Sequence, residues 1–460
     1  MKYRSTRGKA PELDFADVLL TGLAIDGGLY CPESIPVLPE LASGASYTQI
    51  AQQVMWPFVE GSIDQVDFNR MVEEAYASFA TPEVCPVVDL GGGHFLLDLT
   101  QGPTLAFKDV ALQLVGRLLD YELGRRGETN TVVAATSGDT GSAAIEALKN
   151  RPNVRALVLH PLGRVSDVQR RQMTTVDAPN IRNLALEGTF DDCQDIVKEA
   201  FGDPELRAAF GLAAVNSINW ARVMAQIVYY VTAARTVAPD GGPVSFCVPT
   251  GNFGNILAGW YAKHMGVNID QLIVASNRND VLTRFFETGR LTGDEVVPSL
   301  SPSMDIQVSS NFERMLWEAS GRDSEAVEAL LATFRAEGDV EVPAAWVETI
   351  RSEFDADRLD DEGTLATIRE TNERLGLLID PHTAVGIHTA QTMRRDETVP
   401  MVTLATAAPA KFPDAVENAT GIRPELPAFL SELFDRTERY DVRKASLDEV
   451  ATYLRTQFGY

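Results

Sequence analysis

The hydrophobic pattern changes character at about residue 85. From there, short apolar runs rich in β-branched residues alternate with segments whose apolar positions recur at helical spacing. The runs are TVVAAT (131–136), VRALVLHP (154–161), IRNLALEG (181–188), VSFCVPT (244–250), QLIVASN (271–277) and MVTLATA (401–407). Buried strands that alternate with helices predict an α/β fold with a largely parallel sheet.

The segments outside this alternation differ from it. Residues 1–80 are predicted to be mostly helical, with turns at DGGLYCPESIP (26–36). SEFDADRLDDEGTLA (352–366) is acidic, and we expect an exposed connection or the start of a helix there. The pattern shows no internal repeat and no low-complexity linker.

Length, charge and cysteine spacing narrow the functional classes. The 460 residues suffice for two or three domains, and the net charge of −25 disfavours nucleic acid and anionic membranes as partners. No apolar run is long enough to span a bilayer, and MKYRSTRGKAPELDFAD lacks an apolar signal core, so we expect a cytoplasmic protein. The four cysteines and five histidines show no metal-ligand spacing, and we expect no metal site.

Polar turns follow three of the predicted strands, and ligands of open α/β sheets bind beyond the carboxyl ends of strands. In TSGDTGSAA (136–144), the hydroxyls of Ser137 and Thr140 and the N–H groups at a helix start suit a carboxylate or phosphate. The alternative is an ordinary tight turn in which Ser137 and Asp139 act as helix caps.

The other two turns are PTGNFGNILAG (249–259) and ATAAPAKFPDAV (405–416). Gly251 and Gly254 permit a nest of N–H groups around one phosphate, and the spacing fits neither a nucleoside triphosphate nor a dinucleotide motif. Thr406 lies just past a strand and could direct its hydroxyl into the same cleft. Its alternative role is structural.

Lys108 stands near the first turn of an amphipathic helix, after GPTLAF (102–107). Lysines are usually solvated charges, and the reference pKa of about 10.4 makes an ordinary amine a poor nucleophile. The apolar neighbours of Lys108 favour burial, which would activate it. A reactive amine, a phosphate-binding turn and a second polar turn together describe a pyridoxal phosphate site.

The order of these motifs resembles the threonine synthase family. GPTLAFKD, TSGDTGSAA, NSINWARVMAQ (216–226), PTGNFGN and ATAAPAKFPDAV occur in that order. YRSTRG (3–8) and DGGLYCPE (26–33) are similar to the longer branch of the family, which carries an N-terminal extension. The resemblance implies a tryptophan-synthase-β-like (fold type II) pyridoxal-phosphate enzyme with two α/β domains. The expected division is an extension at 1–80 and a catalytic unit at 81–460, with a smaller domain at about 110–220 and the larger domain from the remainder.

The resemblance also implies roles for individual residues. Lys108 would hold the cofactor covalently, Thr406 would face its pyridine nitrogen, and Asp139 would lie near its ring hydroxyl. Ser137 and Thr140 would bind the carboxylate of the amino acid. The cofactor phosphate would be held by Gly251, Asn252, Phe253, Gly254 and Asn255.

The implied reaction converts O-phospho-L-homoserine and water into L-threonine and phosphate, with Lys108 serving several proton transfers. Arg164 and Ser166 are candidates for binding the substrate phosphate, with Arg222 and Lys411 behind them. Ala408 departs from the family motif, which usually has histidine there. That histidine could serve chemistry or packing, and the sequence alone does not distinguish the two.

Two other functions remain open. The first is a pyridoxal-phosphate lyase or dehydratase that acts on O-phosphothreonine, O-phosphoserine or threonine. The second is a non-catalytic relative that binds pyridoxal phosphate, although such proteins tend to lose the lysine or the glycine turns. The longer branch of the family suggests a monomer.

Overall fold

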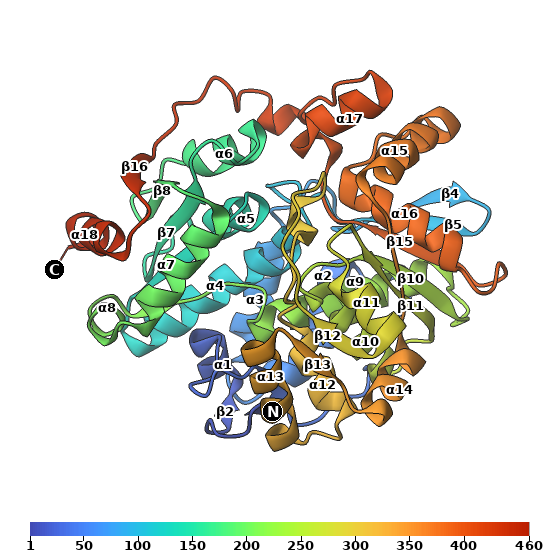
Figure 1. The fold of residues 1–460 in the computed structure, drawn as a ribbon, viewed down its shortest axis with the longest axis horizontal. Coiled ribbons are helices and arrows are strands. Elements are labelled where there is room, and N and C mark those ends of the chain that lie inside the picture. The colour runs from blue at the N-terminus through green and yellow to red at the C-terminus, as the bar shows by residue number, and fades with distance from the viewer. Residues whose placement is uncertain (460) are drawn as a thin grey trace.

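Two largely parallel sheets form the framework of the molecule, and an N-terminal unit packs beside them (Figure 1). The computed structural model describes residues 1–459. Within that range, every helix falls short of the length and apolar character needed to cross a membrane.

The smaller sheet has five parallel strands in the order β16-β8-β7-β6-β9. Its strands are β6 (Asn130–Ala135), β7 (Val154–Pro161), β8 (Ile181–Glu187), β9 (Leu212–Ala213) and β16 (Asp441–Lys444). Its helices are α4 (Lys108–Arg126), α5 (Asp139–Leu148), α6 (Asp167–Thr174), α7 (Phe190–Gly202), α8 (Pro204–Phe210) and α18 (Leu447–Phe458). The strands predicted at 131–136, 154–161 and 181–188 are confirmed. The C-terminal strand β16 also pairs with β8, so the smaller sheet contains a segment that lies outside the expected smaller domain at about 110–220.

The larger sheet has six strands in the order β14-β11-β10-β15-β5-β4, all parallel except the edge strand β4. Its strands are β4 (Val87–Gly91), β5 (His94–Asp98), β10 (Val244–Pro249), β11 (Ile269–Ser276), β14 (Asp355–Arg358) and β15 (Met401–Ala405). The acidic segment 352–366 was predicted as a connection or helix start. It contains the edge strand β14, in which three residues are half-buried and Arg358 is exposed, and then the start of α15.

Helices, short 3-10 turns and one two-stranded sheet surround the larger sheet. The helices are α9 (Trp220–Val237), α10 (Gly254–Met265), α11 (Val281–Thr288), α12 (Phe312–Ala319), α13 (Ser324–Glu337), α14 (Ala344–Glu353), α15 (Asp361–Leu375), α16 (Pro381–Met393) and α17 (Pro413–Thr420). The 3-10 turns are η1 (Pro302–Met304), η2 (Pro409–Lys411) and η3 (Ala428–Leu430). The two-stranded antiparallel sheet pairs β12 (Arg290–Thr292) with β13 (Asp339–Glu341).

The N-terminal unit contains the predicted helices and a small antiparallel sheet that the sequence pattern did not reveal. The helices are α1 (Phe15–Thr21), α2 (Tyr47–Val59) and α3 (Gln65–Tyr76), and the strands are β1 (Lys2–Ser5), β2 (Leu13–Asp14) and β3 (Tyr30–Pro32). The rings of Tyr3 and Phe58 lie 6.0 and 5.6 Å from that of Trp220 on α9. The unit therefore shares the main hydrophobic core rather than forming a separate one.

The polar turns singled out in the sequence follow β6, β10 and β15. Ala106 and Ala407 form an antiparallel bridge, which brings the segment before Lys108 beside the turn after β15. The fold thus gathers the predicted site residues between the two sheets.

Candidate active site

A tight turn sets the position of Lys108 at the start of α4. Leu105 adopts a left-handed conformation with φ of 62°, which is uncommon for a residue with a side chain. The Asp109 carboxylate accepts hydrogen bonds from the Thr104 backbone at 2.8 Å and hydroxyl at 2.7 Å. Gly102 is required there, since a Cβ atom would lie 2.5 Å from Asp109 Oδ2.

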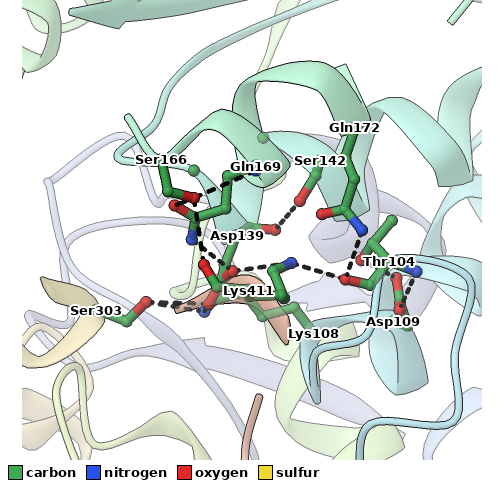
Figure 2. Close-up of polar contacts among 12 residues, drawn as sticks. Thr104, Lys108, Asp109, Asp139, Ser142, Ser166, Gln169, Gln172, Ser303 and Lys411 are labelled. Carbon is green, nitrogen blue, oxygen red and sulfur yellow. Dashed lines mark hydrogen bonds and ion pairs between the residues drawn. The ribbon is translucent and has the colours of Figure 1, made fainter. Parts of the chain in front are cut away.

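The amine of Lys108 is buried and faces two polar groups (Figure 2). Its Nζ lies 3.1 Å from Asp139 Oδ2 and 3.3 Å from Ser303 Oγ. Burial lowers the pKa of the Lys108 amine from its ordinary value, Lys411 and Arg222 lower it further, and Asp139 raises it. The net direction is downward, so the amine holds its proton less tightly than an ordinary lysine does.

Asp139, the first residue of α5, connects the groups around this amine. Its Oδ1 lies 2.9 Å from Lys411 Nζ and accepts a hydrogen bond from Gln169 Nε2 at 2.8 Å. Burial raises the pKa of the Asp139 carboxyl, but Lys108, Lys411 and His382 outweigh it and hold the pKa well below the usual range. We call Lys108, Asp139 and Lys411 the charged cluster.

The turn between β10 and α10, residues 250–255, presents backbone N–H groups instead of charges, and we call it the anion turn. Phe253 has φ of 62°, and its ring packs edge-on against Phe312 at 5.2 Å and Phe354 at 5.3 Å. The first N–H groups of a helix lack partners within it and favour an anion. The buried ring therefore anchors a backbone that is suited to a phosphate.

Neutral side chains from the segment before α12 support the anion turn. Ser309 Oγ donates to the Gly251 carbonyl at 2.8 Å, and Ser310 Oγ donates to Asn252 Oδ1 at 3.1 Å. The Asn311 backbone N–H donates to the Asn252 carbonyl at 3.1 Å. These contacts occupy oxygen atoms of the turn, while the Thr250 N–H donates to the Ala275 carbonyl at 2.9 Å and the N–H groups of residues 251–255 are left available.

Two further features of the anion turn fit the phosphate of a cofactor. Asn255 Oδ1 accepts hydrogen bonds from Tyr229 at 2.5 Å and Tyr230 at 2.9 Å, while Asn255 Nδ2 is buried without a partner among residues 1–459. A Cβ atom at Gly251 would lie 2.6 Å from the carbonyl oxygen of Ser303. A bound phosphate would supply the acceptor that this buried donor lacks, and the glycine lets the turn pack directly against the Ser303 backbone.

Three predicted hydroxyls lie free around these groups. Thr406 follows β15, and its carbonyl accepts a hydrogen bond from the Phe107 backbone at 2.9 Å, next to Lys108. Ser137 in the turn after β6 and Thr140 in the first turn of α5 are both half-buried. Within the described part of the chain, none of the three hydroxyls has a hydrogen-bond partner, so each is available to a ligand.

Ser166 and Arg164, the two candidates for binding the substrate phosphate, lie in different surroundings. Ser166 caps α6, and its hydroxyl lies 2.9 Å from Gln169 Oε1 and 3.3 Å from the Lys411 carbonyl oxygen, at the edge of the charged cluster. Arg164 is exposed, and its electrostatic contact is with Asp192 on α7. The structure thus brings Ser166, but not Arg164, into contact with the cluster.

Arg222 on α9 is a buried cation without a counter-ion. Its Nη1 donates to the Val215 carbonyl at 3.1 Å, and over residues 1–459 no carboxylate lies within 4.0 Å of it. Its Nε is buried and also lacks a partner in that range. Burial lowers the pKa of Arg222 to about 10, and its charge acts on the Lys108 amine. An unpaired buried guanidinium beside a reactive amine is suited to receive an anion.

Ser303, Gln169 and His382 complete the site but were not predicted from the sequence. The Ser303 hydroxyl lies between Lys108 and Asp139, to whose Oδ2 it donates at 3.2 Å. Its backbone N–H lies 3.4 Å from His382 Nε2, and His382 Nδ1 lies 2.6 Å from Asp380 Oδ2. SPSMD (301–305) carries no recognisable local signal, because these residues reach the site through the long connection before α12.

The surroundings of Ala408 bear on the departure from the family motif. Ala408 packs with Leu105 and Leu430 in a small apolar cluster, and its N–H donates to the Leu105 carbonyl at 2.9 Å. A side chain at this position therefore points into an apolar layer. This favours the packing role over the chemical one.

Sequence models of three families cover most of the chain. They are the threonine synthase N terminus at residues 2–76, pyridoxal-phosphate dependent enzyme at 88–347 and the threonine synthase C-terminal region at 383–454. The first range coincides with the N-terminal unit, and each of the other two ranges contains strands of both sheets.

Individual relatives agree with the family models. A threonine synthase of Pseudomonas aeruginosa is 53% identical over 460 residues, which cover 99% of this chain and 98% of that protein. The pyridoxal-phosphate-bound threonine synthase of Brucella melitensis superposes with a TM-score of 0.96 at 50% identity, over 99% of each chain. The yeast threonine synthase superposes with a TM-score of 0.94 at 38% identity, over 99% of this chain and 98% of that one. The chain therefore belongs to the threonine synthase family of pyridoxal-phosphate-dependent lyases, with the fold of type II.

Proposed function

We propose that the chain converts O-phospho-L-homoserine and water into L-threonine and inorganic phosphate. The observation that carries the proposal is the buried Lys108 amine, paired with Asp139 and placed near an anion turn with free donors. Membership in the threonine synthase family supports the choice of substrate.

The residues of the site suit pyridoxal phosphate. Lys108 would hold it covalently, and the anion turn, from Gly251 to Asn255, would hold its phosphate. Thr406 would face the pyridine nitrogen and Asp139 the ring hydroxyl. When bound, this cofactor supplies an electron sink for negative charge at the Cα atom of an amino acid.

Lys108 would also move the protons. The reaction removes protons from Cα and Cβ, returns one to Cγ and, after water has added at Cβ, returns one to Cα. A base must be neutral to accept a proton. A lysine buried beside two other cations satisfies that need better than a solvated one. The Ser303 hydroxyl would orient the freed amine, since it contacts Lys108 Nζ.

Separate groups would hold the two anionic ends of the substrate. Ser137 and Thr140 would bind its carboxylate through their free hydroxyls. Arg222 is the best-supported partner for the leaving phosphate, because it is buried, charged and without a carboxylate among the residues described. Ser166 and Arg164 are further candidates, and Arg164 would have to approach from the surface.

The test is an end-point assay with purified protein, pyridoxal phosphate and O-phospho-L-homoserine, in which threonine and phosphate are both measured. We expect equal amounts, abolished in Lys108→Ala and retained in Lys263→Ala, which removes a partly exposed lysine paired with Glu353. Phosphate with 2-oxobutyrate in place of threonine would instead show the lyase alternative. Bound cofactor without turnover of any phosphorylated amino acid would show a non-catalytic relative.

We further propose that the protein works as a cytoplasmic monomer. The four cysteines are free and buried, and the surface carries a large negative charge that opposes self-association. Light scattering coupled to size exclusion tests the monomer, and fractionation of cells tests the compartment. A dimer mass or membrane-pelleted protein would contradict the proposal.

A further inference from the structure

One carboxylate serves two buried lysines in the charged cluster. Asp139 Oδ2 lies 3.1 Å from Lys108 Nζ, and Asp139 Oδ1 lies 2.9 Å from Lys411 Nζ. The side chain of Lys411 is fully buried, with 0% exposed, and that of Asp139 is 2% exposed. The two lysines come from different parts of the chain, α4 and η2, and meet only through Asp139 (Figure 2).

Lys411 is held from several sides. Its Nζ donates to the Thr104 carbonyl at 2.7 Å, and its own carbonyl oxygen lies 3.3 Å from Ser166 Oγ. A buried ammonium needs acceptors of this kind. Because Thr104 belongs to the turn before Lys108, Lys411 links that turn to the Asp139 carboxylate.

The charged groups that face Lys108 come from three elements. Among residues 1–459, Asp139 of α5 is the one anion, and the cations are Lys411 of η2 and Arg222 of α9. The charge of His382 on α16 acts on Asp139. With the three cluster residues ionised, the cluster carries one net positive charge in a buried space, and Arg222 adds another.

We propose that Lys411 is a positioning residue that weakens the hold of the Lys108 amine on its proton by sharing Asp139, the one carboxylate within 4.0 Å of that amine among residues 1–459. The proposal rests on the function proposed above, in which Lys108 holds the cofactor. Without Lys411, Asp139 would serve Lys108 alone, and the Lys108 ammonium would be stabilised. Lys411 acts through Asp139 and does not itself contact the Lys108 amine.

The electrostatics of the site support this role. Burial is the largest cause that lowers the pKa of Lys108, and Lys411 contributes in the same direction against Asp139. Neutralising Lys411 removes a lowering influence and strengthens the raising one, so the pKa of Lys108 should rise. At neutral pH, a smaller fraction of the amine would then be available as a base.

The test measures the titration of Lys108 directly in the cofactor-free protein. Competitive acetylation by acetic anhydride, quantified by peptide mass spectrometry across pH, reports the midpoint at which this amine becomes reactive. We expect a wild-type midpoint below the ordinary lysine value of about 10.4 and a rise of at least about one pH unit in Lys411→Gln and Lys411→Met. Lys411→Arg keeps the charge and should keep the midpoint, as should Lys263→Gln at a distant surface pair.

Several results would overturn the proposal. An unchanged midpoint in Lys411→Gln, with only a lower melting temperature, would show a purely structural role. A wild-type midpoint at the ordinary lysine value would overturn it even if no neutral variant folds. Lys108→Ala tests the proposed function separately. If this variant kept the visible absorbance band of the bound cofactor, Lys108 would not be the cofactor lysine. The acetylation midpoint is measured without cofactor and does not depend on that result.

Discussion

The charged cluster is built from ionised side chains, whereas the anion turn is built from backbone N–H groups and neutral side chains. The cluster assembles full charges from α4, α5 and η2 around one carboxylate. The anion turn is supported by Ser309, Ser310 and Asn311, which are all neutral, and it offers N–H donors. Both regions lie at strand-to-helix turns, so the fold alone does not explain the contrast.

The difference reflects what each region does in the proposed reaction. A group that takes up and releases protons must have nearly balanced charged and neutral forms, and neighbouring charges provide that balance. A group that keeps an anion bound needs donors that never titrate, and backbone dipoles provide them. Perturbing the first region should therefore change pH dependence and stability, and perturbing the second should change cofactor affinity.

The largest effect is expected from Asp139→Asn, which leaves two buried lysines without a counter-ion. Removing one partner of a buried ion pair costs about 3–5 kcal/mol, so the free energy of unfolding should fall by about that amount. Urea denaturation at neutral pH measures it. Asp195→Asn at the exposed pair with Lys198 is the control and should cost less than about 1 kcal/mol. Equal losses in the two variants would remove the distinction between buried and surface charge.

The ionisation of Asp109, the residue after Lys108, should give a pH dependence of similar size in the free energy of unfolding. Burial raises the pKa of its carboxyl to about 6, so this carboxyl binds a proton more tightly in the folded protein than in the unfolded chain. The corresponding stabilisation is present below the ordinary value near 3.9 and is lost as pH rises through about 6, to a total of about 3 kcal/mol. The free energy of unfolding of wild type minus that of Asp109→Asn should therefore decrease between pH 4.5 and 7. A difference that increases with pH would show that Thr104 stabilises the charged form instead.

The anion turn should respond to added volume rather than to charge. In Gly251→Ala, the new Cβ would lie 2.6 Å from the Ser303 carbonyl oxygen and must force the backbone apart. Overpacking of this kind costs about 1–3 kcal/mol, and if that cost falls on the bound form, the dissociation constant of pyridoxal phosphate should rise about 5- to 150-fold. In Gly254→Ala, the new Cβ would lie 3.2 Å from the Asn311 side chain and 3.8 Å from the Ser217 carbonyl oxygen, which is a smaller overlap and should change the constant less. The reverse order, measured by absorbance titration, would contradict the close approach at Gly251.

The smallest effect concerns the free donor of the anion turn. Asn255→Ala removes the unpartnered Nδ2 and should raise the dissociation constant of pyridoxal phosphate about tenfold, the value of one hydrogen bond. Tyr229→Phe removes a hydrogen bond to Asn255 Oδ1 but leaves Nδ2 in place. In Tyr229→Phe, the dissociation constant of pyridoxal phosphate should change less than about threefold. A larger effect in Tyr229→Phe would mean that the orientation of the amide matters more than its donor.

Much of the fold and some of the site followed from local sequence pattern. The strands at 131–136, 154–161, 181–188 and 244–250 are confirmed, because buried parallel strands are continuous apolar runs between turn residues. The edge strand β14 and the strand β16 escaped prediction. Both are short and rich in charged residues, β14 is mostly half-buried and β16 is exposed, and each forms through pairing with a strand that is distant in the sequence.

The site shows the same division. The position of Lys108 at a helix start, the turn at Asp139 and the glycines of the anion turn are properties of short segments, so the sequence by itself determined them. The meeting of Lys411 with Asp139, the approach of Ser303 and the isolation of Arg222 depend on segments separated by tens to hundreds of residues. Only the tertiary structure decided these, because distances between charges, and the burial that strengthens their interaction, exist only after the chain has packed.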